Sequence, residues 1–271
     1  MRGPHAPLAE FNASNPEFIT KTAIATIWKV QSPHGPAALK LYHKPDMGTE
    51  RNGFTLMATL NGNGAAKVYQ TTQNAALTEW LNGPALGDLT RSGQDDLAAK
   101  ELADVAIALH KNMPTTANLP TLTARFHALK TLRFDCPAAA KHSLLHAQTL
   151  TEHLLKTQTD IRPLHSDLHH DNIRRTPRGT LAFDAKGLFG ERSFELANAF
   201  RNPKGAEPLH RDPARIRHLA QSWGQAFAVS PQRLLQWAAA KCALSIAWRS
   251  NGTFENDPEL DLFNTLLATK I

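Results

Sequence analysis

The stretch that decides the fold is PLHSDLHHDNIRRTPRGTLAFDAKG, residues 163–187. It places His165, Asp167 and Asn172 in the spacing H-x-D-x-x-x-x-N, and Asp184 follows twelve residues after Asn172, behind the apolar run Leu-Ala-Phe. The Thr-Pro-Arg-Gly segment between them is typical of a turn, which would fold Asp184 back towards the polar loop. The order of loop, turn, β-like run and aspartate predicts a hairpin that gathers these polar side chains.

These residue types suit phosphoryl transfer to a hydroxyl group. That reaction needs a carboxylate to orient the acceptor and take its proton, and oxygen ligands that hold Mg²⁺ against the β- and γ-phosphates. Asp167 can serve as the carboxylate, and Asn172 and Asp184 can serve as the oxygen ligands. An ordinary hairpin with buried polar caps is the simpler interpretation of the same pattern.

A zinc site is another interpretation of this stretch, built from His165, His169, His170 and Asp171. Adjacent histidines on a regular element do not readily face one ion. The sequence also holds no H-E-x-x-H motif and no alternating run of histidines. The pattern therefore disfavours zinc catalysis.

LHSDLHHDNI, followed by FDAKGLFGERSFELANAFRNP, resembles the aminoglycoside and hydroxyurea kinases, a family that includes streptomycin phosphotransferases. The similarity is strongest between Leu164 and Pro203, and a weaker similarity covers most of the chain. These enzymes are small-molecule relatives of the protein kinases. The resemblance implies an α+β, bilobal, protein-kinase-like fold, with a small β-rich N-terminal lobe in residues 1–81 and a mostly helical C-terminal lobe in residues 82–271.

The resemblance also implies an activity. We expect ATP- and Mg²⁺-dependent transfer of the γ-phosphate to a hydroxyl of an aminoglycoside-like acceptor, with Asp167 as the catalytic base. His165 would brace the loop, and Asn172 and Asp184 would bind the metal. Two alternatives stay open: a non-catalytic, pseudokinase-like nucleotide-binding module, and a kinase of a sugar or amino-alcohol metabolite.

The first lobe carries β-branched and aromatic runs that predict short strands, over residues 17–20, 26–32, 38–42, 65–69 and 75–77. In the third run Lys40 stands among apolar neighbours, which by itself suggests an edge-strand lysine pointing to solvent. The resemblance implies instead the lysine that contacts the α- and β-phosphates. Glu50, at the start of an expected helix over residues 50–60, would hold it. Asp46 competes for that role, and an acid in a first turn also suits the helix dipole.

The resemblance places the hinge, whose backbone meets the adenine, at Glu79 and Leu81. Trp80 between them has core packing as its commoner fate. The chain departs from the kinase pattern before the second strand, where TKTAIA (residues 20–25) replaces a G-x-G-x-x-G loop. This departure supports the non-catalytic alternative.

Two charged features admit both a functional and a plain interpretation. Lys186 follows Asp184 in the sequence Ala-Lys-Gly, and we expect it to touch a phosphate or a loop carboxylate, with a solvent-facing lysine as the alternative. Four acids gather near the C-terminus: Glu255, Asp257, Glu259 and Asp261. They predict either a solvated loop before a final helix or a wall of a pocket for a cationic acceptor.

Apolar residues at helical spacing predict the helices of the second lobe, over residues 95–111, 144–156 and 194–200, through 216–227, and from 230 to 248. Ser230-Pro231 adds a cap followed by a proline in the first turn.

The composition disfavours several other classes of protein. The formal charge of +6 is spread along the chain, and the cluster Arg174, Arg175 and Arg178 lies inside the expected hairpin, so we expect no nucleic-acid partner. No apolar run approaches the ~20 residues of a membrane helix, and the N-terminus has no apolar signal core. Cys136 and Cys242 fit no disulfide or metal pattern. We therefore expect a reducing, cytoplasmic setting.

Overall fold

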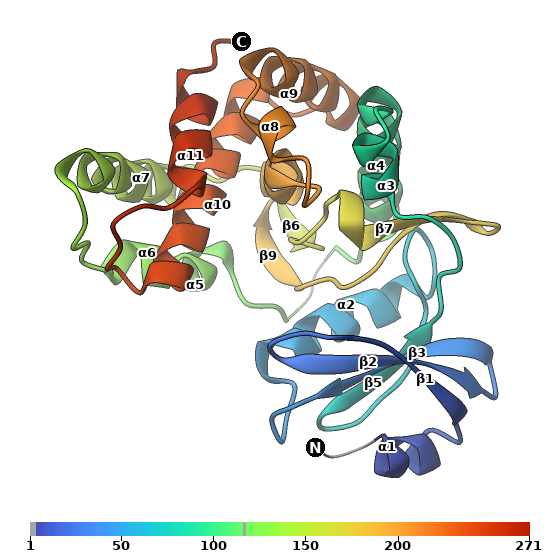
Figure 1. Cartoon of the computed structure of the whole chain (residues 1–271). Coiled ribbons are helices and arrows are strands. Elements are labelled where there is room, and N and C mark those ends of the chain that lie inside the picture. The colour runs from blue at the N-terminus through green and yellow to red at the C-terminus, as the bar shows by residue number, and fades with distance from the viewer. Residues whose placement is uncertain (1–3, 116–117) are drawn as a thin grey trace.

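The computed structural model describes residues 4–115 and 118–271. Figure 1 shows a sheet-containing lobe near the N-terminus and a larger, mainly helical lobe that carries the C-terminus. Among the described helices, none is long and apolar enough to cross a membrane.

The first lobe is built on an antiparallel five-stranded sheet with the order β1-β2-β3-β5-β4. Its strands are β1 (Ser14–Lys21), β2 (Ala25–Ser32), β3 (Gly35–Tyr42), β4 (Val68–Thr71) and β5 (Ala75–Glu79). In β3 the buried residues Ala37 and Leu39 alternate with half-buried ones, so Lys40 points to the opposite face of the sheet. Because β3 is the central strand, the edge-strand interpretation of Lys40 is wrong.

Helices cover both faces of this sheet. On one face, Leu8 of α1 (His5–Glu10) packs with Val30 and Leu39 in one apolar cluster. On the other, Phe54 of α2 (Arg51–Leu60) packs with Ala76 in another. A short 3₁₀ turn, η1 (Gly48–Glu50), precedes α2, so Glu50 ends that turn instead of opening the α-helix. The Glu50 carboxylate still lies close to β3, with 3.8 Å between Glu50 Oε2 and Lys40 Nζ.

The second lobe also contains two small two-stranded sheets. β7 (Ile173–Thr176) pairs with β8 (Gly179–Ala182), and β6 (Ile161–Leu164) pairs with β9 (Leu188–Glu191). The expected strand over 65–69 begins later, at Val68, because Ala65 and Ala66 pair instead with Ala182 of β8. This pairing ties the first lobe directly to the hairpin.

The helices of the second lobe are α3 (Leu86–Arg91), α4 (Asp95–Asn112), α5 (Leu122–Arg125), α6 (His127–Thr131), α7 (Ala138–Lys156), η3 (Arg192–Arg201), α8 (Glu207–His210), α9 (Pro213–Phe227), α10 (Pro231–Ser250) and α11 (Glu259–Ala268). Helix α10 is buried almost all round, as expected for a helix inside a core. Its cap is the predicted one, since the Ser230 side chain accepts a hydrogen bond from the Arg233 backbone N–H. The expected α-helix over 194–200 is a 3₁₀ segment, and every residue from Ser193 to Phe200 is buried.

Candidate active site

The loop over residues 165–172, called the catalytic loop below, is held through its backbone by a fully buried carboxylate, Glu195 of η3. Its two oxygens accept hydrogen bonds from the N–H groups of His165 (2.9 Å) and Ser166 (2.8 Å), and from His110 Nε2 (2.8 Å). Burial alone would raise the pKa of Glu195, but the hydrogen bond and charge of His110 lower it. Ser166 needs such support because its φ of 61° is unfavourable for a non-glycine residue. The role of Glu195 was not predicted, although an acid inside the apolar run SFELANAF was a usable signal.

His165 bridges the loop and the Asp184 segment. Its Nδ1 accepts from the Asp167 N–H (3.3 Å), and its Nε2 then donates to the Phe183 carbonyl (3.0 Å). Burial lowers the pKa of His165, in keeping with a neutral ring. Both ring nitrogens are thus engaged with the backbone, which suits a brace better than a proton acceptor.

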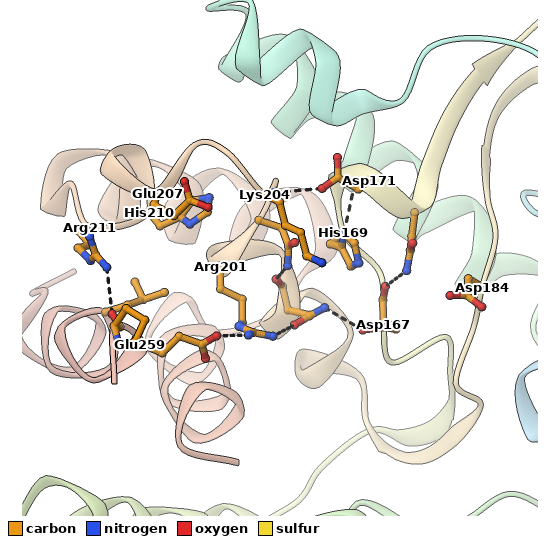
Figure 2. Close-up of a pocket in the computed structure, with 15 residues that line it drawn as sticks. Asp167, His169, Asp171, Asp184, Arg201, Lys204, Glu207, His210, Arg211 and Glu259 are labelled. Atoms are coloured by element: carbon orange, nitrogen blue, oxygen red, sulfur yellow. Dashed lines mark hydrogen bonds and ion pairs between the residues drawn. The ribbon is translucent and has the colours of Figure 1, made fainter. Parts of the chain in front are cut away.

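The Asp167 carboxylate has one fixed oxygen and one freer oxygen. Oδ1 accepts a hydrogen bond of 2.8 Å from Asn198 Nδ2, whereas the nearest cation to Oδ2 is Lys186 Nζ at 3.9 Å. The side chain lines a cavity of about 680 Å³. Figure 2 shows it between Asp184 on one side and Arg201 and Glu259 on the other.

Asn172 and Asp184 line the same cavity as Asp167. Asn172 Nδ2 donates to the Asp167 carbonyl (3.0 Å), which turns the amide oxygen away from the loop backbone. Burial alone would raise the pKa of Asp184, but the charges of Lys40 and Lys186 lower it to about 2. An amide oxygen and an ionised carboxylate are ligands that suit Mg²⁺, with phosphate oxygens and water filling the other positions. Among the described residues, no group of three His, Cys, Asp or Glu side chains is placed to hold a metal ion by itself.

Both lysines near Asp184 lie within ion-pair distance of Glu50, and Lys186 is the nearer of the two. Lys40 Nζ donates to Asp184 Oδ1 at 2.6 Å and lies 3.8 Å from Glu50 Oε2. Lys186 Nζ is the closer partner of Glu50 Oε2, at 2.9 Å, and lies 4.0 Å from Asp184. Asp46, the competitor for Lys40, accepts a hydrogen bond from the Gly48 N–H instead. Lys186 is therefore a half-buried group in contact with carboxylates and does not face solvent alone.

A second, narrower cavity of about 240 Å³ lies under β3, between Lys40 and the hinge. Leu81 and Trp80 form part of its wall, and Asp184 lies at one end of its lining. The Glu79 carboxylate accepts two hydrogen bonds from Arg178 (2.5 and 3.0 Å), which lower its pKa against the raising effect of burial. The carboxylate is thus already bonded, and the Glu79 N–H donates to the Lys67 carbonyl (2.8 Å), so a contact of Glu79 with a nucleotide would be made by its backbone carbonyl.

The arginines of the hairpin are bonded inside the molecule. Arg178 also donates to carbonyls of the first lobe, Arg174 Nη1 donates to the Gly83 carbonyl (2.6 Å), and Arg175 pairs with Glu101 at 3.3 Å. These contacts fasten the hairpin to the hinge and to helix α4. Nothing in the local sequence indicated them.

Only part of the group of four C-terminal acids lies at the cavity that Asp167 lines. Of these described acids, only Glu259 lines it. Asp257 is buried in a salt bridge with Arg249 (2.7 Å) and caps α11 through the Glu259 N–H. Glu255 and Asp261 are exposed. Two helical residues of separation turn Asp261 by about 200° from Glu259, so the two side chains leave α11 in nearly opposite directions.

The wall of the cavity carries mixed charge instead. Arg201, Lys204 and Arg211 contribute cations, and Asp171, Glu207 and Glu259 contribute acids (Figure 2). Glu259 pairs with Arg201 and Arg249, and Asp171 pairs with Arg91 (3.0 Å). Within the described part of the chain, no cation lies within ion-pair distance of Glu207. Apart from Glu259, none of these wall residues was predicted, because they come from separate elements.

Comparison with known proteins agrees with this geometry. A sequence model of the aminoglycoside/hydroxyurea antibiotic resistance kinases matches residues 12–252. A streptomycin 3''-kinase of Klebsiella pneumoniae is 36% identical over 220 residues, which cover 79% of each chain. The chain belongs to the aminoglycoside/hydroxyurea antibiotic resistance kinase family. The predicted family and its phosphotransferase activity towards a hydroxyl group are thereby confirmed.

Solved structures confirm the kinase-like fold. A thermostable mutant of aminoglycoside phosphotransferase APH(4)-Ia, in ternary complex with ADP and hygromycin B, superposes with a TM-score of 0.67 at 11% identity, over 98% of this chain and 97% of the other. A choline/ethanolamine kinase family protein from Mesorhizobium loti superposes with a TM-score of 0.65 at 12% identity, over 96% and 88%.

Proposed function

We propose that this kinase transfers the γ-phosphate of ATP, with Mg²⁺, to a hydroxyl of a streptomycin-like aminoglycoside. The observation that carries the proposal is the setting of Asp167. Its Oδ1 is fixed by Asn198, and the carboxylate opens onto a cavity that Asn172 and Asp184 also line. Its 36% identical relative is a streptomycin 3''-kinase, which supports the choice of acceptor.

In this proposal Asp167 orients the acceptor hydroxyl and takes its proton. The hydroxyl oxygen forms a bond to the γ-phosphorus while the bond from that phosphorus to the β–γ bridging oxygen breaks, leaving ADP. Asn172 and Asp184 would hold Mg²⁺, which would supply positive charge against the phosphates. His165 keeps the loop in place against the Asp184 segment, because Nδ1 bonds to the Asp167 N–H and Nε2 to the Phe183 carbonyl.

The nucleotide is proposed to occupy the cavity under β3. Leu81 would pack against the base, and the backbone of Glu79 would meet its edge. Lys40 would leave Asp184 for the phosphates and be braced by Glu50, which is already 3.8 Å away. Lys186 would complete the positive side of the phosphate site. The glycine-poor turn keeps its shape without glycine, since Thr22 Oγ1 accepts from the Ala25 N–H and donates to the Ala25 carbonyl.

The acceptor is proposed to lie against α8 and α11, where Glu207 offers an acid without an ion-pair partner among the described residues. A guanidinium or ammonium group would supply that partner. The nucleotide and acceptor cavities meet at Asp184, which lines both. We propose that the boundary between the two lobes falls between residues 81 and 82. Because the proposed reaction depends on ATP, we propose that it takes place in the cytoplasm.

Transfer of labelled γ-phosphate tests the proposal. The acceptors would be streptomycin, other aminoglycosides, hydroxyurea, sugars and amino alcohols, each with the wild-type protein and with Asp167→Asn. Asp104→Asn, an exposed acid paired only with Lys100, is the matched control. We expect transfer to streptomycin that Asp167→Asn abolishes and the control retains. Transfer to a sugar or amino alcohol alone would overturn the proposed acceptor, and full activity of Asp167→Asn would overturn its catalytic role.

A further inference from the structure

A third cavity, of about 390 Å³, lies where the start of α2, the α5–α6 segment and the end of α10 meet. In Figure 1, α5 and the lower end of α10 lie on the side of the helical lobe that faces α2. The cavity shares no lining residue with the acceptor or nucleotide cavities. Neither the transfer chemistry nor the proposed substrates account for it.

The charged groups at this cavity are cations. Arg125 and Lys186 line it, and no Asp or Glu is among its described lining residues. The Arg125 guanidinium lies over the Trp248 ring, 4.2 Å from its centroid, and Lys241 Nζ lies 5.3 Å from the same ring. The remaining wall is mostly apolar, with Pro120, Ala124, Ala128 and Leu188.

Two cations at the Trp248 ring have no directly bonded anion in the described part of the chain, although the charges of Asp167 and Glu50 act on Arg125 and those of Asp167 and Glu259 act on Lys241. Neither the Arg125 nor the Lys241 side chain makes an ion pair or a hydrogen bond there, although Lys241 is only 7% exposed. Burial, together with the nearby charge of Arg201, lowers the pKa of Lys241 to about 8. Burial also lowers the pKa of Arg125. The half-buried Arg125 guanidinium lines the cavity without a hydrogen-bond partner in the described part of the chain, so its donors are available to an anion that enters there.

We propose that this cavity binds an amphipathic anion, with a carboxylate or sulfonate head on a ring-sized apolar body. The head would pair with Arg125 and Lys186, and the body would pack against Trp248 and Leu188. Like charge disfavours the cationic acceptor here. The site lies beside the proposed phosphate site, with which it shares Lys186, and adds a ligand class that the kinase reaction does not require.

Occupancy of this cavity is linked to the nucleotide site through Lys186. An anion that engages Lys186 competes with Glu50 for it, now 2.9 Å away. Glu50 is then available to Lys40, which in turn can release Asp184. Nucleotide with Mg²⁺ is consequently expected to leave anion binding intact or to tighten it.

Fluorescence titration with 8-anilinonaphthalene-1-sulfonate, an aromatic sulfonate, tests the proposal. The titration would be repeated with saturating AMP-PNP·Mg²⁺ and with saturating streptomycin. We expect saturable binding to one site that neither addition displaces. Arg125→Met should weaken it by about tenfold or more, the loss expected for one charge-assisted hydrogen bond.

Two further variants keep the test decisive. Trp248→Leu changes a side chain that is 40% exposed, so it provides a second probe of the cavity if Arg125→Met does not fold, and it should also weaken binding. Arg133→Met, at an exposed arginine outside the cavity lining, is the matched control and should bind as the wild type does. Displacement by AMP-PNP or streptomycin, or equal affinity in the cavity variants and the control, would overturn the site. Phosphoryl transfer is measured separately, so failure here leaves the proposed function untouched.

Discussion

Glu195→Gln is the substitution that best tests how the catalytic loop is held. The carboxylate is completely buried and accepts three hydrogen bonds, two of them from consecutive N–H groups of the loop. A glutamine has the same shape but only one acceptor oxygen, and its amide N–H groups would face a donor. At least one loop N–H would therefore lose its partner.

The size of the effect follows from these contacts. Breaking a buried ion pair or leaving such a group unpaired costs about 3–5 kcal/mol. At about 2 °C per kcal/mol for a protein of this size, Tm should fall by about 6–10 °C. The loop would also relax around Ser166, which has an unfavourable positive φ. A displacement of about 1 Å at a reacting group can cost about 100-fold, and we expect kcat to fall by that order with little change in KM for ATP.

Glu191→Gln is the control that distinguishes a loss of loop positioning from a loss of stability. Glu191 is also buried, at 2% exposure, but pairs with Arg233 and not with the catalytic loop. Thermal unfolding and steady-state kinetics of both variants, measured below their Tm, form the assay. We expect similar losses of Tm, but a large loss of kcat only in Glu195→Gln. Equal kcat in the two variants would refute the positioning role.

Three other outcomes can be measured on the same protein. Asp184→Asn should remove the increase in ATP affinity that Mg²⁺ causes. Metal-free ATP binding should remain, because Lys40 loses the carboxylate that holds it away from the phosphates. Calorimetry with and without Mg²⁺ is the measurement, and an intact Mg²⁺ effect would contradict the prediction. Glu207→Gln should raise KM for streptomycin by about tenfold and leave KM for ATP unchanged, whereas equal changes in both would argue against an acceptor contact. Burial lowers the pKa of His210 to about 4, so the unfolded state binds more protons as pH falls below the ordinary histidine pKa of about 6.5. The contribution of His210 to stability should thus be present above pH 6.5 and be lost as the pH falls from 6.5 to 4. His210→Gln should make the decline of Tm over that range smaller. An unchanged decline of Tm in this variant would contradict the prediction.

The sequence predicted the features that depend on short segments. The polar residues from His165 to Asn172 are near in the chain, and a turn of ordinary type returns Asp184 to them, so local spacing was sufficient. The central position of β3 was not predicted, because strand order depends on pairing between segments that are distant in the chain. Contacts between distant segments were less accessible, since Lys186 and Glu50 are 136 residues apart and their pairing depends on how α2 sits over the hairpin.

The four C-terminal acids show a second limit on what the sequence can predict. Charge density near the C-terminus was correctly noticed, but the direction of each side chain depends on where α11 begins. Asp257 ends up as a cap, and Glu259 is the member of the group that reaches the cavity. A shift of one or two residues in the helix start would have selected a different acid, and helix boundaries are not fixed to that accuracy by sequence patterns.

Four charged side chains connect the nucleotide cavity with the third cavity. Lys40 and Asp184 line the nucleotide cavity, and Lys186 lines the third one. Lys40 and Lys186 balance Glu50 and Asp184, so the group is neutral as it stands. When Lys40 turns to nucleotide phosphates and Asp184 to a metal ion, Glu50 is left between two lysines. It can brace Lys40 fully only if Lys186 finds another anion. Besides the nucleotide phosphates, the candidates are Asp167, 3.9 Å away, and a ligand in the third cavity. Lys186 drawn towards Asp167 would compete for the carboxylate that must take the acceptor proton, whereas an anion in the third cavity would hold Lys186 away from it.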